Sequence, residues 1–155
     1  MPALIRNNTI VSDEWCFDAS DSDGIGRRRA YSLSEWKEDG RPAHAGVQME
    51  PGDDCRELAE ALPRLELIAV HFPAFTDGRG FSMARELRDL GYRGELRARG
   101  HILPDQMHFL HRCGFDAFQP DDSSRLGASL ERLQGFSEHY QAAVDQPLPL
   151  FRRRG

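Results

Sequence analysis

A glycine-rich loop at residues 73–82 carries the first residues that could bind a ligand. Four of them stand in a row: Asp77, Gly78, Arg79 and Gly80. Glycine lets a ligand approach the backbone closely, and the planar guanidinium of Arg79 suits two-point recognition of an anion. The loop matches a dinucleotide-binding fingerprint only in part, because Met83 stands where the third glycine belongs. We therefore predict an anion site here. A tight structural turn is the alternative, since Asp-Gly is ordinary turn chemistry.

Two arginines on an alternating segment, Glu95–Gly100, give a second candidate. Period-two alternation places Glu95, Arg97, Arg99 and His101 on one face of a strand. Burying Arg97 or Arg99 without a partner would be costly, so each must meet a carboxylate, a ligand anion or water. The candidate partners are Asp77, Asp105 and Asp116. An internal ion pair with Glu95 and a solvent-facing edge are the alternatives. Asp105 and Gln106, at the start of the next helix, complete the predicted anion-binding set with Arg97 and the loop.

The histidines do not form a clear metal-binding pattern. His108 and His111 lie three residues apart on a predicted helix, and Asp105 precedes His108 by the same interval. We expect Asp105, His108 and Arg112 to face solvent, and we predict no metal site. The apolar side of this helix is expected to carry Gln106, Met107, Phe109, Leu110 and Cys113. His71, at the end of a buried strand, is expected to be a hydrogen-bonded core histidine that points toward the anion site.

The cysteines favour a reduced protein. Cys16, Cys55 and Cys113 lie 39 and 58 residues apart, which excludes a dense disulfide framework and a closely spaced zinc motif. Cys113 is predicted to be a small buried apolar residue.

Alternating strands and helices must position these residues. The pattern predicts strands at 45–50, 67–72, 95–100 and 115–118, and helices at 54–62, 81–90, 104–114 and 123–144. Such an order gives an α/β fold with a small open parallel sheet of about four βα units, half-barrel-like or a three-layer sandwich. A short N-terminal hairpin at 4–11 turns at Asn7-Asn8. Ligands of open α/β sheets bind beyond the carboxyl ends of the strands, which would bring the loop and Arg97 into one cleft.

Length and composition fit one domain. The 155 residues carry a net charge of −5, with 39% hydrophobic and 29% charged residues. We expect a single α/β domain over 1–145, with an irregular hairpin and loop region at 1–44 and βα repeats at 45–145. Residues 146–155 are predicted to be a flexible tail, either frayed or docked on a partner. No apolar run approaches the ~20 residues of a membrane span, and no signal peptide is evident. We expect a cytoplasmic protein that binds neither membranes nor nucleic acid.

Several linked motifs resemble a known family. They are Phe72–Ser82, Gly91–Ala98, Asp105-Gln106 and Arg112–Phe118, with further similarity at Phe136-Ser137, at Tyr140-Gln141 and around Trp15 and Trp36. Together they resemble the bacterial domain of unknown function 934 family. The resemblance implies an oxidoreductase label and a gene beside the haemoprotein of assimilatory sulfite reductase; it supplies no catalytic residues. The chain departs from the family pattern at Arg99 and His101, where a small apolar and an acidic residue are expected.

These observations lead to one expected function and two alternatives. The first is an accessory protein of assimilatory sulfite reduction that aids electron or substrate delivery to a sirohaem sulfite reductase. Its partners would be the reductase haemoprotein and a small anion such as sulfite or sulfate. The alternatives are a non-catalytic anion-binding interaction module and a small enzyme acting on a phosphorylated or sulfated metabolite. No flavin, nicotinamide or iron–sulfur motif is visible, so the sequence leaves open the cofactor and whether the protein is an enzyme.

Overall fold

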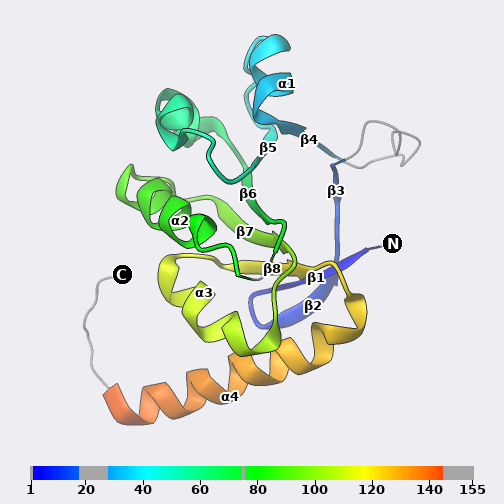
Figure 1. Ribbon diagram of the computed structural model, residues 1–155, viewed down its shortest axis with the longest axis vertical. Helices are drawn as coiled ribbons and strands as arrows, with labels where there is room; N and C mark the ends of the chain where they lie inside the picture. Colours follow the sequence, from blue (N-terminus) through cyan, green and yellow to red (C-terminus); the bar gives the residue numbers. More distant parts are fainter. Residues whose placement is uncertain (1, 18–27, 75, 145–155) are drawn as a thin grey trace.

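Eight strands form one curled sheet in the computed structural model, which describes residues 2–17, 28–74 and 76–144 (Figure 1). The strands are β1 (Ala3–Arg6), β2 (Thr9–Ser12), β3 (Trp15–Cys16), β4 (Arg28–Ser32), β5 (Gly46–Met49), β6 (Leu67–Phe72), β7 (Glu95–Gly100) and β8 (Ala117–Pro120). The helical segments are α1 (Leu33–Glu38), η2 (Cys55–Arg64), α2 (Arg79–Asp89), η3 (Pro104–Gln106), α3 (Met107–Cys113), η4 (Ser123–Arg125) and α4 (Leu126–Val144), where η marks a 3₁₀ helix.

The strand order explains the half-barrel shape. It runs β2-β1-β8-β7-β6-β5-β4-β3, so the strands from β3 to β8 are neighbours in chain order, and all of them pair in parallel. The α/β class and the half-barrel form are as predicted, but the expectation of a small parallel sheet of four units was wrong. β3 and β4 extend one end of the sheet, and the hairpin β1–β2 adds two antiparallel strands beside β8.

The N-terminal hairpin is present and turns at the predicted residues. Ile5 pairs with Ile10 and Arg6 with Thr9, which leaves Asn7 and Asn8 as the turn. Both asparagines are left-handed, with φ of 55° and 59°. A type I′ turn requires this conformation at both central residues, and asparagine tolerates it better than most residues.

Local capping sets the bounds of the shorter helices. Ser32 and Glu35 form a reciprocal capping box at the start of α1. Asp54 also begins a helix, η2, but accepts from the Arg56 N–H, and Glu57 pairs with Lys37 instead of completing a box. The predicted helix at 54–62 is therefore a 3₁₀ helix with a simple aspartate cap. Gly114, with φ of 119°, ends α3 as predicted.

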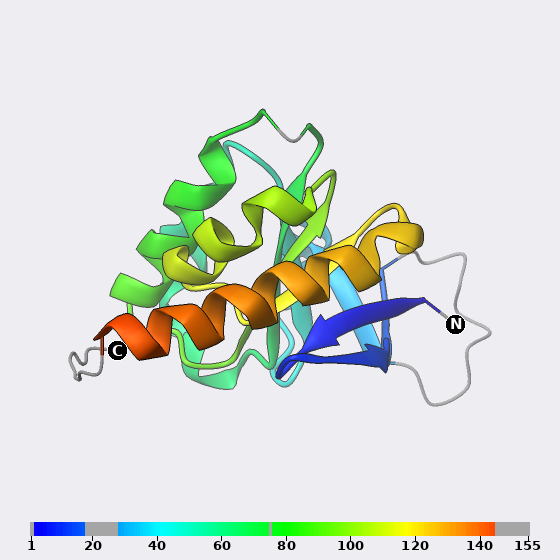
Figure 2. The ribbon, with the colours of Figure 1, turned by 90° about the horizontal axis from the view of Figure 1, so that it is seen from below.

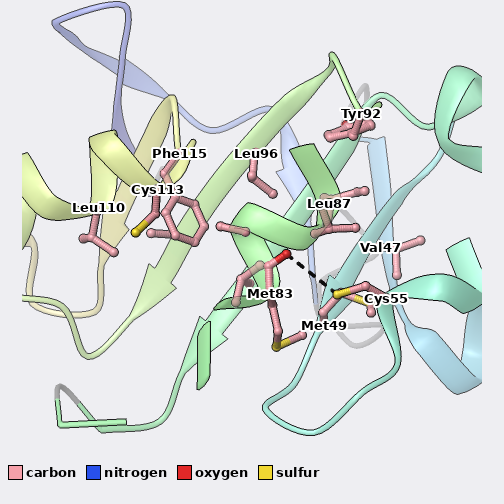
Figure 3. Packing of buried hydrophobic residues seen from close by; sticks show 14 of the residues in the cluster. Val47, Met49, Cys55, Met83, Leu87, Tyr92, Leu96, Leu110, Cys113 and Phe115 are labelled. Carbon is pink, nitrogen blue, oxygen red and sulfur yellow. Dashed lines mark hydrogen bonds between the residues drawn. The ribbon is translucent and has the colours of Figure 1, made fainter. Parts of the chain in front are cut away.

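The main core lies between the sheet and the helices on its convex side. Val47 and Met49 of β5 point to this side, as do Leu96 of β7 and Phe118 of β8. Met83 and Leu87 of α2 pack over them, and Cys55 of η2 lies 3.8 Å from the Met83 carbonyl (Figure 3). Because strand side chains alternate, the residues between these face the concave side of the sheet.

The long helix α4 lies along α3 and the β1–β2 hairpin (Figure 2). Leu126 and Leu133, seven residues apart on one side of α4, are buried. On α3, Phe109 was expected on the apolar side, but 49% of it is exposed, and its ring lies 4.8 Å from that of Phe81. Residues 18–27 of the predicted hairpin and loop region, and the predicted tail at 146–155, lie outside the described residues. No helix within the described part of the chain is long and apolar enough to cross a membrane.

Candidate anion-binding site

Side chains from neighbouring strands form rows across the concave face. At the amino end, Gly46 of β5 aligns with Leu67 of β6, and the Trp15 ring covers them; a Cβ on Gly46 would lie 3.0 Å from that ring. Toward the carboxyl end the rows become polar. One contains Gln48, Ala69, Arg97 and Ala117, and the next contains His71, Arg99 and Gln119.

Arg97 is a completely buried member of this polar face. Its side chain is 0% exposed and fits between Ala69 and Ala117, whose small side chains leave it room. The guanidinium donates to Asp13 at 3.0 Å, to Glu95 at 2.9 Å and to the Gln119 amide oxygen at 2.9 Å. Two carboxylates therefore neutralise Arg97, so its role is structural pairing.

Arg99, two residues after Arg97 on the same strand face, has different hydrogen-bond partners. Its Nε donates to the amide oxygen of Gln119 at 3.1 Å, and its Nη1 donates to that of Gln48 at 2.8 Å. Its guanidinium carbon lies 3.8 Å from the centre of the Phe17 ring. Burial lowers the pKa of Arg99, and the neighbouring Arg97 charge acts in the same direction against the opposing effects of Asp13, Asp121 and Glu50. Among the described residues no carboxylate bonds to Arg99, so it is a half-buried cation held by neutral groups.

A histidine–carboxylate pair lies at the same edge of the sheet. His71 Nδ1 is 2.7 Å from Glu50 Oε1, and the Gln48 amide donates to the other Glu50 oxygen at 3.0 Å. The pair is connected to Arg99 through Gln48. Gly100 fits beside it because a Cβ there would lie 2.9 Å from the His71 ring and 2.6 Å from the Phe72 carbonyl oxygen. His71 is thus hydrogen-bonded, as expected, and partly exposed.

The strands place these groups where open α/β folds bind ligands. Glu50 follows β5, while His71, Arg99 and Gln119 stand near the carboxyl ends of β6, β7 and β8. One cation, one imidazole and two primary amides share this end of the concave face with the Glu50 carboxylate, which is bonded to His71 and Gln48. The guanidinium, imidazole and amides are groups that recognise an oxyanion, with the guanidinium supplying charge and the amides supplying orientation.

The residues that were predicted to line one cleft do not lie together in the structure. Arg97 faces the concave side, whereas α2, which carries Arg79, covers the convex side. Arg79 is paired with Asp77 at 2.9 Å, an interaction that lowers the pKa of Asp77. Asp105 pairs with Arg132. The remaining members have local roles: Gln106 caps the Leu103 N–H, and Gly78 and Gly80 begin α2.

The carboxylates predicted to pair with Arg97 and Arg99 were also wrong. Asp77, Asp105 and Asp116 do not pair with Arg97 or Arg99; Asp116 accepts from the Leu96 N–H and lies 3.6 Å from Arg88. The internal pair with Glu95, which the sequence left as an alternative, is present. The predicted strand face is correct for Glu95, Arg97 and Arg99, while His101 lies beyond the strand end.

Sequence reasoning missed the neutral partners. Gln48 and Glu50 alternate at the end of one predicted strand, and Gln119 follows Ala117 in the same way. Polar alternation at several strand ends was a usable signal for a polar concave face. Asp13 and Phe17 carry no such signal, since they lie on either side of β3, which has only two residues and shows no period.

Metal and thiol chemistry find little support in the described residues. No group of three or more His, Cys, Asp or Glu side chains there could hold a metal ion. Burial, reinforced by Arg112 and His111, lowers the pKa of His108 to about 4. Cys16, Cys55 and Cys113 are buried thiols, and burial raises the pKa of Cys55 to about 12.

Comparison with known proteins gives one result. A family model described as "Bacterial protein of unknown function (DUF934)" matches residues 46–151. This range includes β5 to β8, with the His71–Glu50 pair, Arg99 and both glutamines. A search of curated proteins found no match.

Proposed function

The chain belongs to the DUF934 family of bacterial proteins, and we propose that it is an accessory protein of assimilatory sulfite reduction that binds a small oxyanion at Arg99. One observation carries the anion site: Arg99 is a half-buried guanidinium whose hydrogen-bond acceptors are neutral amides. A buried cation without a carboxylate is costly, and an oxyanion would supply the missing charge.

Sulfite and sulfate suit this position chemically. Each presents several oxygens at the spacing that a guanidinium recognises through two hydrogen bonds. The Gln48 and Gln119 amide oxygens fix the plane of the Arg99 guanidinium, and the Phe17 ring limits one side of it. In this proposal the protein delivers the anion to a sirohaem sulfite reductase.

Thermal unfolding in different salts tests the anion site. Sulfite and sulfate should raise the melting temperature more than chloride at equal ionic strength, because a ligand of the native state stabilises by mass action. Arg99→Gln should abolish the difference. Arg64→Gln, a change at an exposed arginine elsewhere, should keep it. Equal effects of the three anions on the unchanged protein would contradict the proposal.

Association with the reductase tests the accessory role separately. Purification from the native organism should recover the reductase haemoprotein with this chain. Anion binding without that association would instead support the non-catalytic interaction module. An absorbance spectrum of the purified protein distinguishes electron delivery, which needs a redox group, from delivery of the anion.

The His71–Glu50 pair favours a second candidate, a small enzyme acting on a phosphorylated or sulfated metabolite. A carboxylate at Nδ1 orients the imidazole so that Nε2 can exchange a proton with a ligand. Hydrolysis of aryl phosphates and aryl sulfates should then be measurable and should fall about 10²–10⁴-fold in His71→Gln. Absence of turnover with both substrate classes would remove this candidate.

A further inference from the structure

A second basic site lies at the opposite end of the sheet from Arg99. A pocket of about 870 Å³ opens where α2 and α3 end and where β7 and β8 begin. Its titratable and charged lining includes four arginines, one histidine, one cysteine and two aspartates: Arg85, Arg88, Asp89, Arg93, His111, Arg112, Cys113 and Asp116. The chain as a whole is acidic, with a net charge of −5, so this collection of arginines is a local exception.

Three of these arginines are available for a partner. Arg85, Arg93 and Arg112 are exposed, and none of them forms an ion pair or hydrogen bond with another described residue. Arg85 and Arg112 come from different helices, yet both charges oppose the effect of burial, which raises the pKa of Cys113 in the pocket wall. Both arginines and Cys113 line the same pocket.

Arg88, in contrast, is bound to backbone carbonyls inside the pocket. It donates to the carbonyls of Gly114, Tyr92 and Gly94 at 3.0 Å each, and it lies 3.6 Å from Asp116. Arg88 is thus already bound to the C-cap carbonyl of α3 and to two carbonyls of the loop between α2 and β7. A compact anion seated there would meet the negative ends of α2 and α3. Anionic groups are instead favoured at the rim, beside Arg85, Arg93 and Arg112.

We propose that this pocket binds an acidic segment of a partner protein. An extended chain with several carboxylates can place them at separate rim arginines, which one small anion cannot do. The volume also fits a peptide segment better than an isolated oxyanion, since pockets for drug-sized ligands measure about 300–1,000 Å³. Arginine is the residue best suited to paired hydrogen bonds with carboxylates. This inference is independent of the function proposed for Arg99.

Binding of hexaglutamate to the full chain, measured by titration calorimetry and amide NMR, tests the proposal. Hexaglutamate should bind, hexaglutamine should not, and the shifted amides should include Gly91 and Gly114. The triple variant Arg85→Gln, Arg93→Gln, Arg112→Gln should weaken binding at least about tenfold. Arg64→Gln is the matched control, since Arg64 is also exposed and outside the pocket, and it should bind as the unchanged chain does.

Three results would overturn the proposal. The first is a triple variant that still unfolds like the unchanged protein and binds hexaglutamate with unchanged affinity. The second is an equal loss of affinity in Arg64→Gln, which would indicate general charge attraction. The third is tighter binding of pyrophosphate or ATP than of hexaglutamate, which would identify a small-molecule pocket.

Discussion

Replacing Arg97 by methionine removes the charge at the centre of the concave face while keeping a long side chain. Asp13, which is 1% exposed, would lose its ion pair and keep two neutral donors, the Trp15 N–H at 2.9 Å and the Gln119 amide at 3.0 Å. Glu95 is less affected, because it is partly exposed and lies 3.4 Å from Arg6. The cost of the change therefore falls mainly on Asp13.

Arg97→Met should lower the free energy of unfolding by a large amount for a single substitution, because Arg97 is buried. Removing one partner of a buried ion pair costs about 3–5 kcal/mol, since the other charge stays buried. For a chain of this size, about 2–4 °C of melting temperature correspond to 1 kcal/mol, so the melting temperature should fall by about 6–20 °C. Urea unfolding, followed by fluorescence of the buried Trp15 and Trp36, measures the free energy.

A double variant separates charge from shape. Asp13→Asn with Arg97→Met should recover about 1–3 kcal/mol of the loss, because the double variant leaves no unpaired charge at Asp13. The control Arg56→Met, at an exposed arginine paired with Asp54, should change stability by less than about 1 kcal/mol. The reasoning is refuted if Arg97→Met costs less than about 1 kcal/mol or if the double variant is no more stable than the single one.

Three further measurements address other parts of the fold. Urea unfolding should show that Gly100→Ala destabilises the protein by about 1–3 kcal/mol, because Gly100 has a φ of 114° and lies close to the Phe72 carbonyl. In the same assay Gly127→Ala in α4 should stabilise the protein by up to about 1 kcal/mol, because an added Cβ there meets no atom within 4 Å. Cys55, with its pKa raised to about 12 by burial, should resist iodoacetamide at pH 8 until urea unfolds the chain; rapid native labelling seen by mass spectrometry would contradict its burial. The pKa of His108 is lowered mainly by burial and then by Arg112, so its contribution to stability is complete above pH 6.5 and is lost as the pH falls toward 4. Arg112→Gln should raise this pKa in an NMR titration, and an unchanged value would exclude the charge effect.

Local patterns in the sequence predicted the elements that build the middle of the sheet. The bounds of β6 and β7 are as predicted, because an apolar run and a strict alternation are both strong strand signals. The Asn7-Asn8 turn was also predictable, since its residue types match the required backbone conformation. β3 was missed because it has two residues, too few to show a period. β4 was missed because Arg28 and Arg29 follow a polar segment and looked like part of a loop.

The site was harder to predict because its partners come from distant parts of the chain. Alternation correctly placed Arg97 and Arg99 on one face. Nothing local indicated that Asp13 would neutralise Arg97 while Arg99 would donate hydrogen bonds to amides and stack on Phe17. Those contacts depend on how the hairpin and the segment after it return to the sheet, which spacing within one strand does not encode.

The antiparallel end of the sheet has a consequence for folding during synthesis. Turn formation can pair β1 with β2 within microseconds, but β1 also pairs with β8 through Ile5 and Phe118. At roughly 5–20 residues per second, the ribosome delivers β8 only seconds after the hairpin has emerged. Leu4 and Ile5, both fully buried in the finished protein, stay uncovered during that interval. The nascent chain therefore carries an apolar strand edge that a chaperone can bind until β8 arrives.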